Sequence, residues 1–135
     1  MKRYIKITCA LALTALVWSG CSTKFPVDGN GILITDRTEC YVSNFDLLGS
    51  TFISVISGSP VIDTVAQTVN ATVYYGTDLK NLYPQFSLPT ACILTPAITG
   101  KTDFSDTTHP RQYTVVSGNR KVKKTYTVYI SVQKP

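Results

Sequence analysis

The stretch TYTVYISV, residues 125–132, alternates apolar and polar side chains along its whole length. One side of the alternation carries Tyr126, Val128, Ile130 and Val132, and the other carries Thr125, Thr127, Tyr129 and Ser131. Successive side chains of a β-strand point to opposite faces of its sheet, so this period of two is typical of a half-buried strand. The stretch therefore predicts a strand with one face in a core and the other toward water.

The same period recurs in QTVNATVYY (67–75), YVSNFDLL (41–48) and QYTVV (112–116). The side chains expected to face the core are Val69, Ala71, Val73 and Tyr75 in the first, Tyr41, Phe45 and Leu47 in the second, and Tyr113 and Val115 in the third. Turn-forming residues separate these runs, and Ser117-Gly118-Asn119 is expected to close a hairpin. The pattern predicts an all-β fold, an immunoglobulin-like antiparallel β-sandwich of about seven strands.

The first twenty residues have the composition of a cleaved signal peptide. Lys2, Arg3 and Lys6 precede an apolar run from residue 7 to residue 18. As a helix this run would reach roughly 18 Å, which is shorter than the roughly 30 Å hydrocarbon core of a bilayer. We therefore expect a targeting segment that takes no part in the fold.

The end of this segment, Val17-Trp18-Ser19-Gly20-Cys21, resembles a bacterial lipobox. The resemblance implies that Cys21 is lipidated and becomes the first residue of the mature protein, which would then bind the membrane through its lipid. Trp18 departs from the usual Leu-like residue, and cleavage after Ser19 by an ordinary signal peptidase is the alternative. The expected organisation is a lipoprotein signal peptide at 1–20, a lipidated flexible tether at 21–38 and the sandwich domain at 39–135.

The charge of the chain is reduced once the signal is removed. The full sequence has 13 Lys and Arg against 8 Asp and Glu, and three of the basic residues lie in the signal, which leaves a net charge of +2. A positive charge this small gives no indication of nucleic-acid binding. The basic segment from Arg120 to Lys124 could face anionic lipid or an acidic glycan, or it could be a solvated turn.

Three ordered motifs follow the same order as in a known family. They are Gly76-Thr77-Asp78-Leu79 with Leu82, Pro84, Phe86 and Leu88; Pro96 with Thr99-Gly100 and Asp103-Phe104; and Tyr113-Thr114-Val115 with Gly118, Lys124 and Tyr126-Thr127-Val128. In these motifs the chain resembles the cadherin-like or immunoglobulin-like domain of unknown function found in gut-bacterial outer-membrane lipoproteins. The resemblance implies a Gram-negative envelope protein linked to glycan uptake or adhesion, with no catalytic residues to transfer. Both the periplasmic face and the cell surface remain open.

Two thiols remain in the predicted domain, Cys40 and Cys92. Outside the cytoplasm such a pair can oxidise to a disulfide, and two unpaired cysteines on different strands are the alternative.

Catalytic and metal-binding signals are sparse. His109 is the only histidine, so a histidine-based triad or a multi-histidine metal site cannot be assembled within one chain. We expect no enzyme activity, no metal and no cofactor. Aromatic side chains expected outside the core could contact a sugar, and the candidates are Tyr74, Tyr83 and Tyr129.

The sequence therefore predicts a lipid-anchored, non-catalytic binding or accessory module of the cell envelope, with a possible role in glycan capture. The alternative is a structural or adhesive subunit that pairs strands with another envelope protein.

Overall fold

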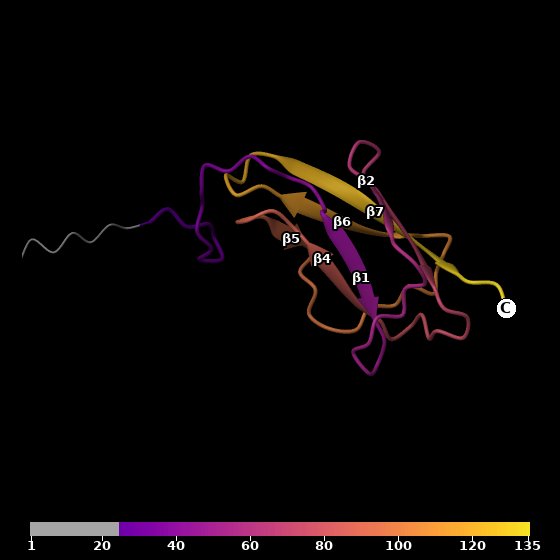
Figure 1. Cartoon of the computed structure of the whole chain (residues 1–135). Helices are drawn as coiled ribbons and strands as arrows, with labels where there is room; N and C mark the ends of the chain where they lie inside the picture. Colours follow the sequence, from indigo (N-terminus) through magenta and orange to yellow (C-terminus); the bar gives the residue numbers. More distant parts are fainter. Residues whose placement is uncertain (1–24) are drawn as a thin grey trace, which may run out of the picture.

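The structure is a computed structural model that describes residues 25–135, and these residues form seven β-strands (Figure 1). The strands are β1 (Asn44–Leu48), β2 (Val61–Asp63), β3 (Thr68–Val73), β4 (Tyr83–Ser87), β5 (Ile93–Thr95), β6 (Arg111–Val116) and β7 (Lys123–Val132). Within this part of the chain no helix is both long enough and apolar enough to cross a bilayer. The predicted signal peptide and the predicted lipidation of Cys21 lie outside the described residues.

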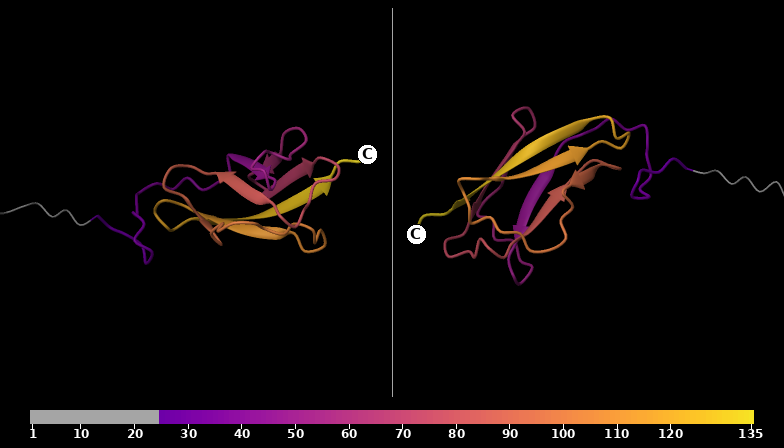
Figure 2. Two further views of the ribbon diagram at one scale, coloured as in Figure 1. Left: turned by 90° about the horizontal axis from the view of Figure 1, so that it is seen from below. Right: turned by 180° about the vertical axis from the view of Figure 1, so that it is seen from behind.

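The strands form two sheets that lie one over the other (Figure 2). One sheet contains only β1 and β4, and the other has the order β2-β3-β7-β6-β5. This arrangement confirms the predicted β-sandwich and its strand number. One pair departs from the antiparallel pattern, because β3 runs parallel to β7 with Val69 opposite Val128. Alternation predicts which face a residue occupies, but not which strand lies beside it or in which direction.

The core lies between the two sheets. Its fully or almost fully buried side chains include Val42, Phe45 and Leu47 near the small sheet and Val69, Ala71, Val73, Tyr113, Val115, Tyr126 and Val128 from the large one. Phe86 joins the two layers, since its ring centroid lies 4.9 Å from that of Phe45 and 4.9 Å from that of Tyr113. The inner faces predicted for β3 and β6 and for Tyr126 and Val128 of β7 are confirmed, whereas Ile130 is half-buried and Val132, at the end of β7, is exposed.

Two tyrosines that were expected in the core are exposed instead. Tyr41 lies before β1 begins at Asn44, and Val42 takes the buried position in its place. Tyr75 lies beyond the end of β3 at Val73. In both places the alternation in the sequence extends further than the strand, so the side chains no longer follow the sheet.

The motif residues of the connecting loops stabilise the backbone. Asp78 Oδ1 accepts the Lys80 N–H at 3.0 Å, and Asp103 Oδ1 accepts the Ser105 N–H at 2.8 Å. Phe104 is buried in the core. These contacts agree with a structural role for the loops.

Residues 25–35, which we call the N-terminal ribbon, fold back on themselves at one end of the sandwich. Val27 and Leu33 face each other in an antiparallel bridge. The Asp28 N–H donates to the Ile32 carbonyl at 2.8 Å, and the Ile34 N–H donates to the Pro26 carbonyl at 2.8 Å. The ribbon is therefore a short two-stranded turn within the segment expected to be a tether.

The ribbon contacts the turn between β6 and β7. Arg120 Nε donates to Asp28 Oδ2 at 3.1 Å, and both side chains are only 15% exposed. The Thr35 N–H donates to the Gly118 carbonyl at 3.0 Å. A side chain at position 118 would meet Thr35 and Arg37, so glycine permits this close approach. The predicted boundary between tether and domain at residue 38 stays a prediction.

Candidate functional site

The outer face of the five-stranded sheet is lined with hydroxyl and amide groups. β3 and β7 lie in parallel register, with Asn70 opposite Tyr129 and Thr72 opposite Ser131. The Thr72 and Ser131 hydroxyl oxygens lie 2.9 Å apart. Farther along the sheet, Thr114 and Thr125 make a second hydroxyl pair at 2.8 Å. These groups can donate and accept hydrogen bonds to a polar ligand that lies on the sheet.

Two of the predicted tyrosines lie on this face. Tyr129 is 45% exposed in the middle of β7, and Tyr74 is 52% exposed just past the end of β3. The Tyr74 N–H donates to the Val55 carbonyl at 3.0 Å, so the backbone is still paired there. Continuing the alternation by one residue places Tyr74 on the side of Thr72, four positions beyond Asn70. At about 3.3 Å per residue the tyrosines are roughly 13 Å apart along the sheet.

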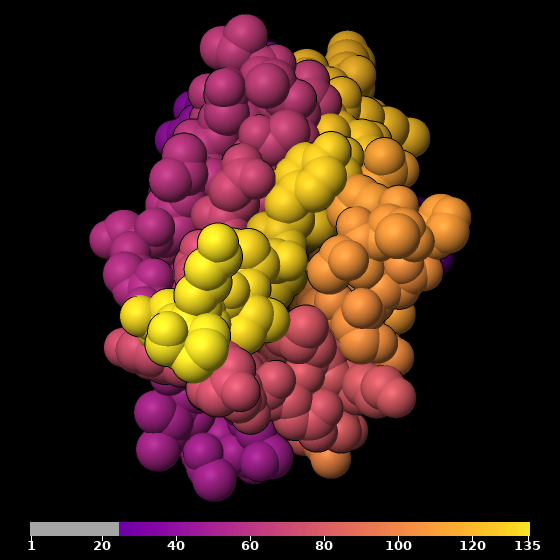
Figure 3. All heavy atoms as spheres, turned by 90° about the vertical axis from the view of Figure 1, so that its right-hand side faces the viewer, coloured from indigo at the N-terminus to yellow at the C-terminus, as the bar shows by residue number. Residues whose placement is uncertain are grey.

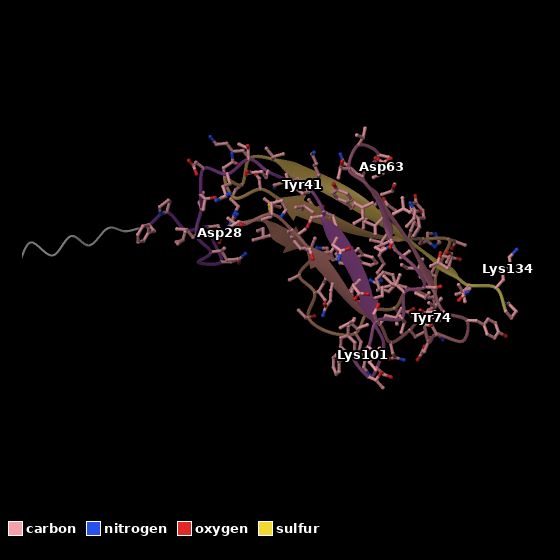
Figure 4. The ribbon with its side chains drawn as sticks, in the orientation of Figure 1. Asp28, Tyr41, Asp63, Tyr74, Lys101 and Lys134 are labelled. Carbon is pink, nitrogen blue, oxygen red and sulfur yellow. The ribbon has the colours of Figure 1, made fainter. Side chains whose placement is uncertain are left out.

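The far end of this face is open to solvent. Figure 4 places Tyr74 toward the end of the molecule where Lys134 lies. Figure 3 looks onto that end and shows the C-terminal residues at the surface, between the segments coloured magenta and orange. Tyr74 is therefore an exposed side chain near this end of the sandwich.

A small hollow lies beside Tyr129. It has a volume of about 40 Å³, and its lining includes Tyr129, Arg111, Pro110 and Asp106. Arg111 Nε donates to the Asp103 carbonyl at 2.6 Å. This contact fixes the guanidinium at the rim of the hollow. The space is about the size of one small group next to an aromatic ring.

Asp106 forms hydrogen bonds mainly with its own loop. Its carboxylate accepts the Thr108 N–H at 3.0 Å and the Thr108 hydroxyl at 2.6 Å, and its Oδ2 lies 2.9 Å from His109 Nδ1. The hydrogen bonds from Thr108, followed by that from His109, hold the pKa of Asp106 well below its usual value. The carboxylate is therefore ionised and engaged at neutral pH.

Asp106, Thr108 and His109 together resemble a triad in composition but not in geometry. Thr108 Oγ1 lies 3.0 Å from His109 Nδ1, which is the same nitrogen that contacts Asp106. A catalytic triad needs one partner on each ring nitrogen, so that the base is oriented on one side and receives a proton on the other. The cluster is highly exposed and stabilises the loop.

Tyr83 does not belong to the outer face. It lies at the start of β4 in the small sheet, where its ring centroid is 4.8 Å from that of Phe52. Phe52 was not among the predicted aromatic residues, and its backbone has a φ of 59° in the turn that follows Gly49. An aromatic residue in a glycine-containing turn is the signal that could have identified it. The three predicted aromatic residues therefore divide between two regions.

Cys40 and Cys92 are both free thiols, and each donates to a carbonyl. Cys40 Sγ lies 3.1 Å from the Val115 oxygen, and Cys92 Sγ lies 3.1 Å from the Glu39 oxygen. Burial raises the pKa of both thiols. Glu39 immediately precedes Cys40, so the Cys92 thiol lies beside the peptide bond that joins these two residues. A disulfide between them stays a prediction.

Acidic and thiol side chains do not gather into a metal-binding group in the described range. Among residues 25–135 there is no cluster of three His, Cys, Asp or Glu side chains that could hold an ion.

Comparison with known proteins gives one family and several similar structures. The family described as "SGBP, N-terminal" matches residues 50–130. No curated protein matches the chain. Among solved structures, a protein provisionally named a glycoside hydrolase from Bacteroides thetaiotaomicron is 29% identical with a TM-score of 0.60. The match covers 75% of this chain but only 27% of that one.

Two further structures share the fold at lower identity. A provisionally named secreted protein from Bacteroides fragilis is 16% identical with a TM-score of 0.54, and the match covers 71% of this chain and 97% of that one. A DUF4623 family protein from Bacteroides eggerthii is 16% identical with a TM-score of 0.53, and the match covers 72% of this chain and 22% of that one. The larger proteins thus contain regions similar to this chain as one part among others.

Proposed function

The chain belongs to the SGBP N-terminal family, a family of starch- or glycan-binding proteins, and from this premise we propose that it is a non-catalytic module that assists glycan capture at the cell envelope. Tyr74 and Tyr129 are the side chains that we propose contact the glycan. The single observation that carries the proposal is the outer face of the large sheet, where these two exposed rings flank the Thr72–Ser131 hydroxyl pair.

The chemistry of this face suits a sugar chain. Sugars present apolar C–H faces and a rim of hydroxyl groups, and an aromatic ring beside hydroxyl and amide groups complements both. The rings lie roughly 13 Å apart along the strands, so a ligand that touches both must be extended. We therefore propose an oligosaccharide or polysaccharide rather than a single sugar.

Two carboxylates near the hollow, Asp103 and Asp106, are unsuited to glycoside hydrolysis, which supports a non-catalytic module. Glycoside hydrolysis needs a carboxylic acid with a raised pKa opposite a second carboxylate. Hydrogen bonds from Ser105 lower the pKa of Asp103, and those from Thr108 and His109 lower the pKa of Asp106. Neither can serve as a general acid near neutral pH. Hydrolase activity in the similar Bacteroides thetaiotaomicron protein would belong to that larger chain.

Attachment to the envelope is proposed through a lipid on Cys21, with the outer membrane as the location. The lipobox-like residues 17–21 support this. Loss of palmitate labelling in Cys21→Ser would be the expected result, and persistent labelling would refute the anchor. Protease treatment of intact cells would place the module on the cell surface or the periplasmic face.

Affinity electrophoresis in gels containing a polysaccharide tests the binding face. Tyr74→Ala and Tyr129→Ala should each reduce retardation while leaving the melting temperature unchanged. Tyr41→Ala is the matched control, since Tyr41 is similarly exposed but precedes β1. Retardation that is equal in all three variants and the wild type, across a panel of glycans, would remove this face from the proposal.

A second candidate function is favoured by the open start of the second edge of β1. β4 pairs with one edge of β1. On the other edge Leu48 bridges Ser54 and the Val55 N–H donates to the Leu47 carbonyl at 2.9 Å, so only the start of the strand is open there. A hollow of about 280 Å³ lined by Asn44, Asp46, Ser59 and other residues lies beside this start. A strand from an envelope protein could add at this edge. Asn44→Lys places a charge there and should abolish a cross-linked complex if this function is correct. A complex that persists in Asn44→Lys would contradict it.

A further inference from the structure

The N-terminal ribbon exposes apolar side chains on one face. Val27 and Leu33 are directly paired, so they share a face of the ribbon. Asp28 is the next residue along and points the other way, to Arg120. Phe25 follows the period of two from Val27 and is 69% exposed. Phe25, Val27 and Leu33 therefore lie on the face of the ribbon opposite Asp28, and all three are exposed, as is Ile32 at 43%.

Basic side chains lie at the same end of the molecule. Lys121 and Lys123 are exposed in and beside the β6–β7 turn that the ribbon contacts. Among the acidic groups nearby, Asp28 binds Arg120 and Glu39 lies 4.0 Å from Arg37. Of the other acidic residues, Asp36 lies nearest in sequence to these two pairs, and its side chain is exposed. Figure 1 shows the ribbon and this turn together at one end, and the C-terminus at the opposite end.

Chain connectivity ties this end to the position of the proposed lipid. Cys21 precedes Phe25 by four residues, which span at most about 14 Å when fully extended. The ribbon is held to the domain by Arg120 and by the close contact at Gly118. A lipid on Cys21 would therefore bring this end of the domain, and not another, to the bilayer.

We propose that Phe25, Val27 and Leu33 insert into the boundary of an anionic bilayer, with Lys121 and Lys123 against the lipid phosphates. We call these five residues the ribbon surface. Exposed aromatic and aliphatic side chains next to lysines are the features by which a segment lies in a membrane interface. The proposal rests on the lipid anchor proposed at Cys21. It makes the sandwich a body with a fixed orientation on the membrane instead of one that hangs from a loose chain.

The test uses residues 21–135 with Cys21→Ser, because the whole described fold lies within this range and binding then does not depend on the lipid. Trp18 is the only tryptophan of the full chain, so the fragment 21–135 contains no tryptophan. One Trp is introduced as Leu33→Trp on the ribbon surface. The control is Val65→Trp, because Val65 is 90% exposed in the connection between β2 and β3.

The probe is vesicles of phosphatidylethanolamine and phosphatidylglycerol, with and without brominated acyl chains. We expect the emission of Leu33→Trp to shift to shorter wavelength and to be quenched by the brominated lipid, with no change for Val65→Trp. Replacing Lys121 and Lys123 together by Ala should weaken vesicle binding about 25-fold, since each lysine contributes about a factor of five at an anionic surface. Gly118→Ala displaces the ribbon and should also reduce quenching.

Three outcomes would overturn the proposal: no change at either Trp, an equal change at both, or a shift at Leu33→Trp without vesicles accompanied by a doubled mass in sedimentation. The last outcome would mean that a second copy of the chain, and not lipid, covers the ribbon surface. None of them affects the glycan assay, and palmitate labelling reports separately on Cys21. Failure of the ribbon surface is therefore distinguishable from failure of the proposed function.

Discussion

On the inner face of β7, Tyr126 and Val128 are buried against the small sheet, whereas the alternating residues Thr127 and Tyr129 lie on the outer face. Valine and threonine have almost the same shape, so Val128 and Thr127 differ mainly in burial and in the presence of a hydroxyl. The inner face contributes to stability through burial, and the outer face presents groups that a ligand can reach. One strand thus separates a buried face from an exposed face by a period of two.

The largest expected effect comes from truncating the inner face. Tyr126→Ala removes a fully buried ring and should lower the free energy of unfolding by about 3–5 kcal/mol. Tyr129→Ala, three residues along, should change it by no more than about 0.5 kcal/mol. Chemical denaturation of both variants measures the contrast. Similar losses in both would mean that the two faces are not divided as described.

A shape-conserving exchange makes the comparison sharper. Val128→Thr places a hydroxyl at a position that is 1% exposed and should cost about 1–3 kcal/mol. Thr127→Val is the opposite exchange on the outer face and should be nearly neutral. It loses only the contact with Gln112, whose amide lies 3.4 Å from the threonine hydroxyl. Thermal unfolding of the pair is the measurement, and a costly Thr127→Val would contradict this interpretation.

Alkaline pH should disturb the inner face. Burial raises the pKa of Tyr126 above its usual value of 10.0, and the backbone of Val42 opposes this in part. The folded state then holds the phenolic proton more tightly than the unfolded chain. This contribution to stability is complete below pH 10 and is lost as the pH rises through the raised pKa. The melting temperature should therefore fall less in Tyr126→Phe than in the wild type between about pH 9 and 11. Equal falls would contradict the assignment.

The smallest effect is expected for the same variant at neutral pH. The Tyr126 hydroxyl is buried and, among the described residues, makes no hydrogen bond of good geometry. Removing it in Tyr126→Phe should leave the free energy of unfolding within about 0.5 kcal/mol, or raise it slightly. A loss above about 1 kcal/mol would reveal a hydrogen bond at this hydroxyl.

The sequence predicted the faces of the strands better than their ends or partners. Val69, Ala71 and Val73 are buried as the alternation required, because a local period is enough to assign a face. Tyr41 was wrongly predicted to be buried, because the alternation in the sequence begins before β1 does, at Asn44. The parallel pairing of β3 with β7 joins residues far apart in the sequence, and no local pattern specifies it.

The candidate site was predictable only in part. Strand alternation identified Tyr74 and Tyr129 as outer-face residues, and their parallel register is the tertiary information that brings them onto one surface. Tyr83 lies instead against Phe52, because its strand belongs to the other sheet. The apolar face of the N-terminal ribbon could not be predicted, since residues 25–35 show little periodicity and depend on Arg120 for their position.

The ten residues of β7 have a consequence for reach. The strand begins beside the β6–β7 turn and runs toward the opposite end of the sandwich. At about 3.3 Å per residue, Tyr129 is roughly 20 Å farther along than Lys123. If the ribbon surface lies on a bilayer, with Lys123 at the lipid headgroups, Tyr129 would lie roughly 20 Å from the headgroups as measured along β7. Tyr74 would lie farther from the membrane still. The length of one strand would then set the height above the membrane at which a glycan is met.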